Sequence, residues 1–458
     1  MKIAGWGRYP KIESECLYPN LPGLVNPIVS KMFANQTQSS IQSHKDDSHP
    51  QPTGHPEFIA RGMGRSYGDS SLAKHTLHTT KLDHFLTFDE QTGVLTCEAG
   101  MSFAEILRIF IPQGWFLPVT PGTQFITVGG AIASDVHGKN HHLDGSFSQH
   151  VLSFTLCLAN GENVECSLNQ NRELFLATCG GMGLTGVILF ATFKLIPIKS
   201  AFIEETTYKT ANLAETLAKF EEHDSATYSV AWIDCLAKGN QLGRSLLMLG
   251  EHATKSAQTP LTVAKPSKLN MPLDLPSFTL NSLSVKAFNT LYYGKVFNQH
   301  SQRIAHYAPY FYPLDSIQNW NRMYGKNGFV QYQFVIPKSA GLVGLSQILS
   351  MIADSKRGSF LAVLKVFGQG NDNYLSFPEE GYTLALDFKM DSSLLAFLDR
   401  LDEVVLSYGG KLYLTKDARM SEQTFKQSYP QWETFQEIRH KYNAHKVFNS
   451  LQSIRLGL

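Results

Sequence analysis

The chain of 458 residues is too long for one ordinary domain, so two or three folding units are expected. Its hydrophobic fraction of 43% and charged fraction of 17% are typical of a globular protein with a sizeable core. The formal net charge of +1 argues against nucleic acid as the main partner, because phosphate binding usually requires a clear basic excess.

The ends of the chain and the cysteines bear on localisation. Residues 1–10 are polar and lack the apolar run of a secretory signal. No stretch approaches the roughly 20 apolar residues that a membrane span needs. The six cysteines are scattered without a C-x-x-C pair, which predicts free thiols in a reducing compartment. We therefore expect a cytoplasmic protein, with peripheral contact to a membrane face left open.

The first part of the chain predicts an α+β fold. Residues 35–56 are polar, contain proline and lack apolar periodicity, which indicates an exposed or mobile loop. From residue 58 to 197, short β-like runs alternate with Gly-rich turns, without a regular βαβ repeat. Helices are expected at 103–113 and 172–178, each ending near a glycine. The expected strands fall within 58–62, 93–100, 125–135, 151–161 and 185–198.

The composition changes near Pro197, where we place a domain boundary. Beyond it, aromatic residues are more frequent, and residues 253–277 form a second polar stretch, interpreted as a plain surface loop, a lid or a disordered insertion. The expected strands in this part are 328–337 and 359–368, and the expected helices are 340–353 and 392–408.

Three Gly-rich segments are candidates for ligand binding. The first is RGMGRSYGD, Arg61 to Asp69, whose glycines permit positive φ and whose backbone N–H groups can cradle a pyrophosphate. The second is PGTQFITVGGAIASDVHGKNHH, Pro121 to His142, whose small residues let a flat, rigid group lie against the backbone. The third is CGGMGLTGVI, Cys179 to Ile188. Each alone is explained by a structural turn, but three in succession favour a shared ligand.

The histidines of the second segment do not predict a metal site. His141 and His142 are adjacent and cannot easily share one ion, and no spaced carboxylate or cysteine accompanies them and His137. For His137, a structural role and a ligand-facing role both remain open.

These segments resemble the FAD-binding domain of the vanillyl-alcohol oxidase family of flavoproteins, and within it the decaprenylphosphoryl-β-D-ribose 2′-oxidase type. The resemblance extends over nearly the whole chain. It is carried outside the Gly-rich segments by GWGRYP (5–10), NWNRMYG (319–325), VQYQFVIP (330–337), LKVFG (364–368), LSFPEEGYTLALDF (375–388) and GGKLYLTKDAR (409–419).

The resemblance implies a two-lobed FAD-binding domain, residues 1–197, to which residues 411–458 return. It implies a substrate-binding domain, residues 198–410, with an antiparallel sheet flanked by helices. Within Arg65-Ser66-Tyr67-Gly68 there is no Cys or His to bond the flavin, so noncovalent FAD is expected. By position, the cofactor-binding residues implied are Arg61, Gly62, Met63, Gly64, Arg65, Ser66, Tyr67, Gly68, Asp69, Gly122, Thr123, Thr127, Val128, Gly129, Gly130, Ser134, Asp135, Val136, His137, Gly138, Val187 and Tyr413.

The same resemblance implies a catalytic group. Alcohol oxidation by a flavin needs a group that takes the hydroxyl proton, and a desolvated lysine near a second cation can serve. We assign this role to Lys416, beside Lys365, although a surface lysine is the ordinary alternative for either. Lys365 lies in an otherwise apolar strand, which favours a pocket. His137 is expected to orient the substrate.

The remaining substrate contacts follow by position. Tyr67 is expected to touch substrate or flavin, and Gln331 and Gln333 are expected to hydrogen-bond the substrate. Ala385 stands where relatives that react with nitroaromatic inhibitors carry cysteine, so no such adduct is expected. The aromatic run 310–312 is interpreted either as core or as a wall for a sugar or an isoprenoid tail.

The expected reaction is FAD-dependent oxidation of a secondary alcohol on a sugar. If the resemblance extends to activity, the substrate is the 2′-hydroxyl of a polyprenyl-phosphoryl ribose in cell-wall biosynthesis, and a separate short-chain reductase completes the epimerisation. Two alternatives remain: an alditol or aldonolactone oxidase that uses oxygen, and a non-catalytic flavin-binding subunit. Fold-level analogy does not decide between them.

Overall fold

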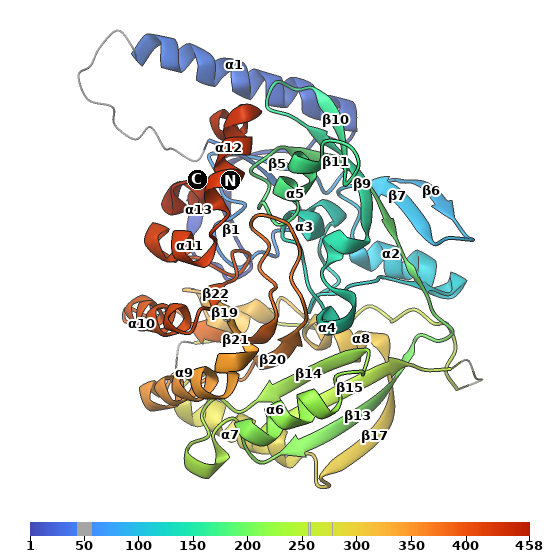
Figure 1. Cartoon of the computed structure of the whole chain (residues 1–458), viewed down its shortest axis with the longest axis vertical. Helices are drawn as coiled ribbons and strands as arrows, with labels where there is room; N and C mark the ends of the chain where they lie inside the picture. The colour runs from blue at the N-terminus through green and yellow to red at the C-terminus, as the bar shows by residue number, and fades with distance from the viewer. Residues whose placement is uncertain (44–56, 255, 257, 277) are drawn as a thin grey trace.

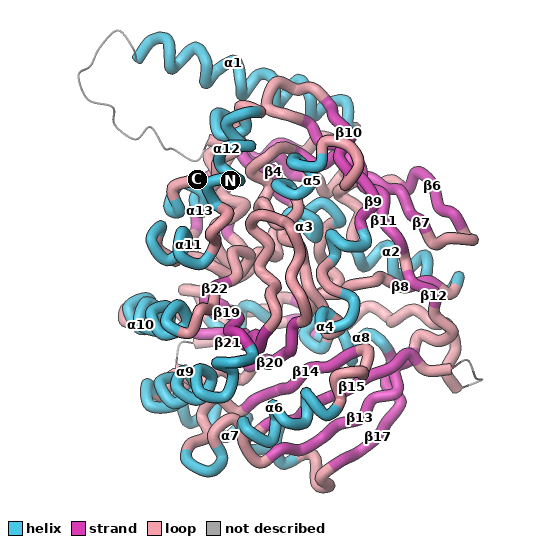
Figure 2. Tube along the Cα trace, in the orientation of Figure 1, coloured by secondary structure: helices cyan, strands magenta, loops and turns pink. Residues whose placement is uncertain are grey.

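The structure is a computed structural model that describes the chain except residues 44–56, 255, 257 and 277 (Figure 1). Its architecture is α+β, with three principal sheets and helices around them, as Figure 2 shows. The α-helices are α1 (Val25–Ser43), α2 (Phe103–Phe110), α3 (Val128–Ala133), α4 (His141–Asp144), α5 (Arg172–Thr178), α6 (Leu213–Glu222), α7 (Ser282–Gly294), α8 (Tyr307–Phe311), α9 (Gly341–Ser355), α10 (Leu394–Ser407), α11 (Glu422–Ser428), α12 (Trp432–Lys441) and α13 (Leu451–Leu456). The 3₁₀ turns are Pro22–Leu24, Ile111–Gln113, Phe147–His150, Gly239–Gln241, Pro313–Ser316, Trp320–Tyr324, Lys338–Ala340 and Ala444–Lys446.

The first 200 residues build two of the sheets. A three-stranded parallel sheet has the order β3-β5-β4, and a five-stranded antiparallel sheet has the order β10-β9-β11-β7-β6. The short pairs β1-β2 and β12-β8 complete this part. The strands are β1 (Lys2–Ala4), β2 (Lys11–Glu13), β3 (Glu15–Leu17), β4 (Phe58–Arg61), β5 (His75–His78), β6 (Phe85–Asp89), β7 (Val94–Glu98), β8 (Trp115–Phe116), β9 (Val151–Cys157), β10 (Asn163–Ser167), β11 (Val187–Lys194) and β12 (Ile196–Pro197).

The third sheet is antiparallel and has eight strands in the order β17-β13-β15-β14-β20-β21-β19-β22. Helices α6, α9 and α10 pack on one face of it. Side chains alternate between the two faces of a strand, so the opposite face is free to line a site. The strands of this part are β13 (Phe202–Thr210), β14 (Tyr228–Ile233), β15 (Ser245–His252), β16 (Leu269–Asn270), β17 (His300–His306), β18 (Ile317–Gln318), β19 (Phe329–Pro337), β20 (Ala362–Phe367), β21 (Gly381–Lys389) and β22 (Lys411–Leu412).

Two sequence-based assignments are wrong. The range 125–135, predicted as a strand, contains helix α3, because the Thr127 hydroxyl caps it by accepting the Gly130 N–H at 3.1 Å. Part of the predicted loop 35–56 is also helical: α1 extends to Ser43, since no Gly or Pro interrupts the polar sequence that follows Phe33. The rest of that loop, residues 44–56, lies outside the described residues. The stretch 253–277 is irregular where it is described, apart from β16.

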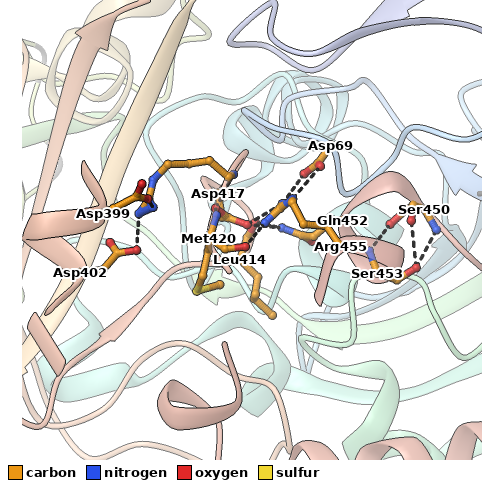
Figure 3. Close-up of polar contacts among 11 residues, drawn as sticks. Asp69, Asp399, Asp402, Leu414, Asp417, Met420, Ser450, Gln452, Ser453 and Arg455 are labelled. Carbon is orange, nitrogen blue, oxygen red and sulfur yellow. Dashed lines mark hydrogen bonds and ion pairs between the residues drawn. The ribbon is translucent and has the colours of Figure 1, made fainter. Parts of the chain in front are cut away.

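The C-terminal segment packs against the beginning of the chain (Figure 3). Arg455 on α13 forms an ion pair with Asp69 at 2.8 Å and a second with Asp417 at 2.8 Å. The Asn449 N–H donates to the Phe58 carbonyl at 2.9 Å. Arg439 on α12 is fully buried and donates to the Phe448 carbonyl at 2.8 Å. These contacts hold α11–α13 beside the Gly-rich loop that follows β4.

Candidate active site

A cavity of about 660 Å³ lies between the Gly-rich loops of the first part and the free face of the eight-stranded sheet. The sheet contributes residues in i, i+2 pairs, which places them on one face of the strands. These pairs are Glu205 and Thr207, Val230 and Trp232, Leu246 and Met248, Ser301 and Arg303, Gln331 and Gln333, and Val363 and Lys365.

The loop after β4 presents its backbone to the cavity. The N–H groups of Met63, Gly64, Arg65 and Ser66 have no acceptor within the described part of the chain. Gly64 has φ +64°, where a Cβ would also lie 2.2 Å from the Arg61 guanidinium. The Arg65 guanidinium lies 3.9 Å from the Trp6 ring, and its Nε also lacks a partner among the described residues. A turn of unpaired N–H groups beside a cation is an anion-binding arrangement.

The second and third Gly-rich segments form the adjoining wall. Residues lining the cavity include Gly129 and Gly130 at the start of α3, Ser134 at its end, and Val187 at the start of β11. The Tyr413 hydroxyl donates to the Ser134 carbonyl at 3.0 Å, so the C-terminal segment closes this wall. Gly122 faces open space, since a Cβ added to it would meet no atom within 4 Å.

Lys365 and Lys416 line the cavity together. Burial, the Lys416 charge and the Lys139 charge lower the pKa of Lys365 to about 7. Burial lowers the pKa of Lys416 to about 8, against the nearby Asp387 carboxylate, which raises it. Both lysines keep some accessible surface, but that surface faces the cavity rather than bulk water. An amine with such a pKa can exchange a proton near neutrality.

Two glutamines of the cavity are hydrogen-bonded to further buried groups. Gln331 donates to Asp387 at 2.6 Å, and Tyr324 donates to the other oxygen of the same carboxyl at 3.1 Å. Burial raises the pKa of Asp387 to about 7. Gln333 Nε2 lies 3.1 Å from His137 Nε2, which fits a neutral imidazole that accepts the amide proton. Burial holds the pKa of His137 well below its usual value.

Comparison with known proteins places the chain among flavoenzymes. The family model described as FAD binding domain matches residues 54–167, and the one described as D-arabinono-1,4-lactone oxidase matches residues 323–455. Decaprenylphosphoryl-β-D-ribose oxidase of Mycolicibacterium smegmatis is 37% identical over 414 residues, which cover 87% of this chain and 89% of that protein. This chain belongs to the decaprenylphosphoryl-β-D-ribose oxidase family.

More distant relatives match over part of the chain. L-gulonolactone oxidase of Bos taurus is 32% identical over 165 residues, which cover 35% of this chain and 36% of that protein. Delta(24)-sterol reductase of Homo sapiens is 26% identical over 185 residues, which cover 40% of this chain and 34% of that protein. A member of the decaprenylphosphoryl-β-D-ribose oxidase family is an FAD-binding oxidoreductase, as the sequence predicted.

The residues of the cavity fit FAD. The unpaired N–H groups of residues 63–66 suit the pyrophosphate, and the glycines at the start of α3 line the cavity without side chains that would fill it. His137 Nδ1 is a buried polar atom without a partner in the described structure, which fits a ligand on that side. The predicted cofactor residues that line the cavity are Arg61, Gly62, Met63, Gly64, Arg65, Ser66, Tyr67, Gly122, Thr123, Thr127, Gly129, Gly130, Ser134, Val136, His137, Gly138, Val187 and Tyr413.

Four residues that the sequence assigned to the cofactor lie outside the cavity lining. A Cβ on Gly68 would lie 1.8 Å from the Asp417 carbonyl, so this glycine is needed for packing. Asp69 pairs with Arg455, and Val128 is fully buried at the start of α3. Asp135 is fully buried and accepts hydrogen bonds, among them one from Ser376 at 2.6 Å. These four residues support the loops that do face the cavity.

The structure adds cavity residues that the sequence analysis missed. Lys139 donates to the Tyr310 carbonyl at 2.5 Å and lies 3.9 Å from the Tyr310 ring, while burial lowers the pKa of Lys139 to about 7. Trp232 and Met248 line the middle of the sheet. Of the aromatic run, Tyr310 and Phe311 line the cavity, whereas Tyr312 is not among its lining residues. Because β14 is buried along its whole length, its sequence shows no polar–apolar alternation that could have indicated the face that lines the cavity.

Ala385 lines the cavity between the strands that carry Lys365 and Gln333. Within the described residues, no group of three His, Cys, Asp or Glu side chains is placed to hold a metal ion. In the same part of the chain, no helix is both long and apolar enough to cross a membrane.

Proposed function

We propose that this enzyme oxidises the 2′-hydroxyl of a polyprenyl-phosphoryl ribose to the 2′-keto sugar, as the first half of an epimerisation. The observation that carries the proposal is a change from polar to apolar side chains between neighbouring strands of the cavity wall. Strands β19, β21 and β20 carry the polar groups Gln331, Gln333 and Lys365, whereas the next strands, β14 and β15, carry Trp232 and Met248.

The length of this wall favours a lipid-linked sugar over a free one. From β20 to β15, across the apolar strand β14, there are two strand spacings of roughly 4.8 Å each, or about 10 Å in all. A free pentose fills only the polar end at β19, β21 and β20, whereas the first part of a prenyl chain can lie against Trp232 of β14 and Met248 of β15. Lys139 lies near enough to Lys365 to lower its pKa, so it is placed to receive the phosphoryl group between sugar and chain.

FAD, when bound, supplies the acceptor for the hydride that leaves the sugar carbon. Lys416 in its neutral form accepts the hydroxyl proton, and the amine of Lys365 is placed to donate a hydrogen bond to the developing alkoxide. Gln331 and Gln333 hold the sugar hydroxyls, and His137, hydrogen-bonded to Gln333, orients the reacting group. Tyr67 lies under Lys416, and Ala385 leaves space beside the sugar.

FAD is held noncovalently in this proposal. In the loop where a covalent bond to the flavin would form, the residue is Tyr67. Among the described residues that line the cavity, the one histidine is His137, and its Nε2 is already hydrogen-bonded to Gln333. Acid precipitation tests this point: noncovalent FAD remains in the supernatant, whereas a covalent flavin would stay in the pellet.

The domain division proposed is 1–197 with 411–458 for FAD and 198–410 for substrate. Strands β1–β12 pair only with one another, and β13–β21 pair with one another and with β22, within the described residues. The contacts of α13 with Asp69 and Leu72 support the return of the C-terminal segment. We further propose a cytoplasmic location, a role in cell-wall biosynthesis and a short-chain reductase as the partner that reduces the 2′-keto product.

One alternative has an observation in its favour. The match of residues 323–455 to the D-arabinono-1,4-lactone oxidase family model favours an aldonolactone or alditol oxidase that uses oxygen. A non-catalytic flavin-binding subunit is the remaining alternative, and the paired lysines argue against it.

Anaerobic bleaching of the bound flavin distinguishes these functions. The panel contains polyprenyl-phosphoryl ribose, free pentoses, alditols and aldonolactones. The proposal expects fast bleaching by the lipid-linked ribose alone. Bleaching by soluble polyols or lactones would assign the alternative oxidase activity, and no bleaching by any compound would refute the proposed substrate.

A further inference from the structure

The segment around α7 exposes an unusual amount of apolar surface. Eight of the nineteen large hydrophobic side chains exposed in the described part of the chain fall within residues 269–304, several times the share expected from its length. On α7, the side chains of Leu283 and Leu291 are 77% and 75% exposed, and Phe297, just after the helix, is 92% exposed. Contiguous exposed apolar surface on a protein marks an interaction site.

The helix directs this surface away from the protein. Val285 and Asn289 are buried and Tyr292 is half-buried, so these residues define the inner face of α7. Leu283 and Leu291, spaced by i, i+8, fall on the opposite face by the 3.6-residue period. An ordinary surface helix carries polar residues there. Figure 1 shows α7 at the end of the molecule opposite to α1.

Unpaired lysines lie on this helix, at its end and in the segment before it. Lys265, Lys268, Lys286 and Lys295 form no ion pair with any described residue. The one acidic residue within 265–304, Asp274, is already paired with Arg8 at 2.6 Å and with Arg322 at 3.2 Å. An apolar helix face flanked by free lysines is the arrangement that binds the interface of anionic membranes.

The same segment reaches the cavity. Tyr292, Lys295 and Val296 line the cavity, and they lie on the inner side and at the end of α7. The exposed apolar face and the cavity are therefore joined through one short element. A prenyl chain that leaves the apolar strands of the cavity would meet this element first.

We propose that α7 and its flanks dock the enzyme on an anionic lipid bilayer, with the cavity opening toward the lipid. The docking surface consists of Leu283, Leu291 and Phe297, with Lys286 on the same helix and Lys268 on the segment that precedes it. The inference rests on the proposed function for its purpose, the delivery of a polyprenyl-linked substrate. Vesicle binding itself is measured without turnover.

The test is co-sedimentation of the FAD-loaded enzyme with vesicles of phosphatidylcholine alone or mixed with phosphatidylglycerol. The triple variant Leu283→Ser, Leu291→Ser, Phe297→Ser is compared with a control that replaces three exposed leucines elsewhere by serine, at positions 86, 152 and 168. We expect the wild type to bind the mixed vesicles, the control to bind within about twofold of it, and the triple variant to bind at least ~10-fold more weakly. The variant Lys268→Gln, Lys286→Gln is expected to lose the preference for phosphatidylglycerol.

Two results would overturn the docking surface: no vesicle binding by the wild type, or equal binding by wild type and triple variant. A concentration-dependent dimer that the triple variant abolishes, without vesicle binding, would overturn it in favour of a second copy of the chain. A water-soluble phosphoryl ribose with a short prenyl chain separates this inference from the proposed function. Equal flavin bleaching by this substrate in the wild type and the triple variant shows that the substitutions affect docking alone. Vesicle binding without bleaching in the wild type refutes the proposed function but supports the docking surface.

Discussion

The side-chain nitrogen of Lys416 lies 4.0 Å from the centroid of the Tyr67 ring. The face of the ring and the Asp387 carboxylate favour the charged amine, and burial favours the neutral one. Burial is the stronger influence, so the pKa of Lys416 falls to about 8 and both forms are accessible near neutral pH. This balance allows Lys416 to act as a proton acceptor near neutral pH.

Removal of this amine tests its role. The substitution Lys416→Met is expected to slow anaerobic flavin reduction by about 10²–10⁴-fold, the usual contribution of a general base, while bound FAD is retained. Stopped-flow absorbance measures the rate. Lys426→Met, at a lysine paired with Glu422 on α11 and away from the cavity, serves as the control and should leave the rate unchanged. A Lys416 variant that reduces its flavin at the wild-type rate would exclude the assignment.

The rate of flavin reduction should depend on pH in a defined direction. The active form of Lys416 is the neutral amine, which predominates above its pKa of about 8. The rate is therefore expected to rise with pH through about 8 and to level off above it. In Asp387→Asn, loss of the carboxylate that raises this pKa should move the midpoint to lower pH. A flat profile in the wild type, or a midpoint that moves upward in the variant, would contradict the account.

Cofactor binding should depend on the backbone of the first Gly-rich loop. Gly64 has φ +64°, which strains any other residue, and a Cβ there would lie 2.2 Å from the Arg61 guanidinium, so Gly64→Ala strains the loop and displaces the loop or the Arg61 side chain. We expect FAD affinity to fall by at least ~10-fold, which is about 1.4 kcal/mol, measured by fluorescence titration of the apoprotein. Gly23→Ala, where a Cβ meets no atom within 4 Å, is the matched control. Equal FAD affinity in the two variants would show that this loop does not hold the cofactor.

The C-terminal segment should contribute to stability through Arg455. The variant Arg455→Met leaves Asp69 and Asp417 as buried carboxylates without their shared cation. A loss of about 3 kcal/mol of unfolding free energy is expected, because removing one partner strands buried charge. Urea denaturation of the FAD-free protein measures it. Arg108→Met, at an exposed pair with Glu105, should change the midpoint little, and a similar small change for Arg455→Met would mean that the segment is held mainly by apolar packing.

Strongly patterned segments of the fold could be predicted from the sequence. Strand β19 and helix α9 fall where the apolar periodicity placed them, within a residue or two. The range 125–135 could not be assigned in this way, because valine and isoleucine suggest a strand while the cap at Thr127 creates a short helix. A polar sequence also concealed the second half of α1, since helix propensity does not require an apolar face.

The cavity residues that belong to a sequence motif could be predicted. The role of a residue could not be predicted where its tertiary contacts determine it. Asp69 and Asp135 stand inside cofactor motifs, yet their carboxylates support the structure through Arg455 and Ser376, which lie hundreds of residues away. Lys139 lies within the second Gly-rich segment, but only the fold shows that it is buried beside Tyr310. Similarly, the exposure of Leu283 and Leu291 cannot be read from helical periodicity alone, because the inner face of α7 is set by its neighbours.

The central claim, oxidation at C2′ of a polyprenyl-phosphoryl ribose, is tested most directly by isotope substitution in the substrate. Deuterium is placed at C2′ in one sample and at C3′ in another, and the anaerobic rate of flavin reduction is measured for each. We predict a severalfold slower rate with the C2′ label, and no change with the C3′ label, because only the bond broken in the oxidation is affected. A slow rate with the C3′ label alone, or no bleaching by either substrate, would contradict the account.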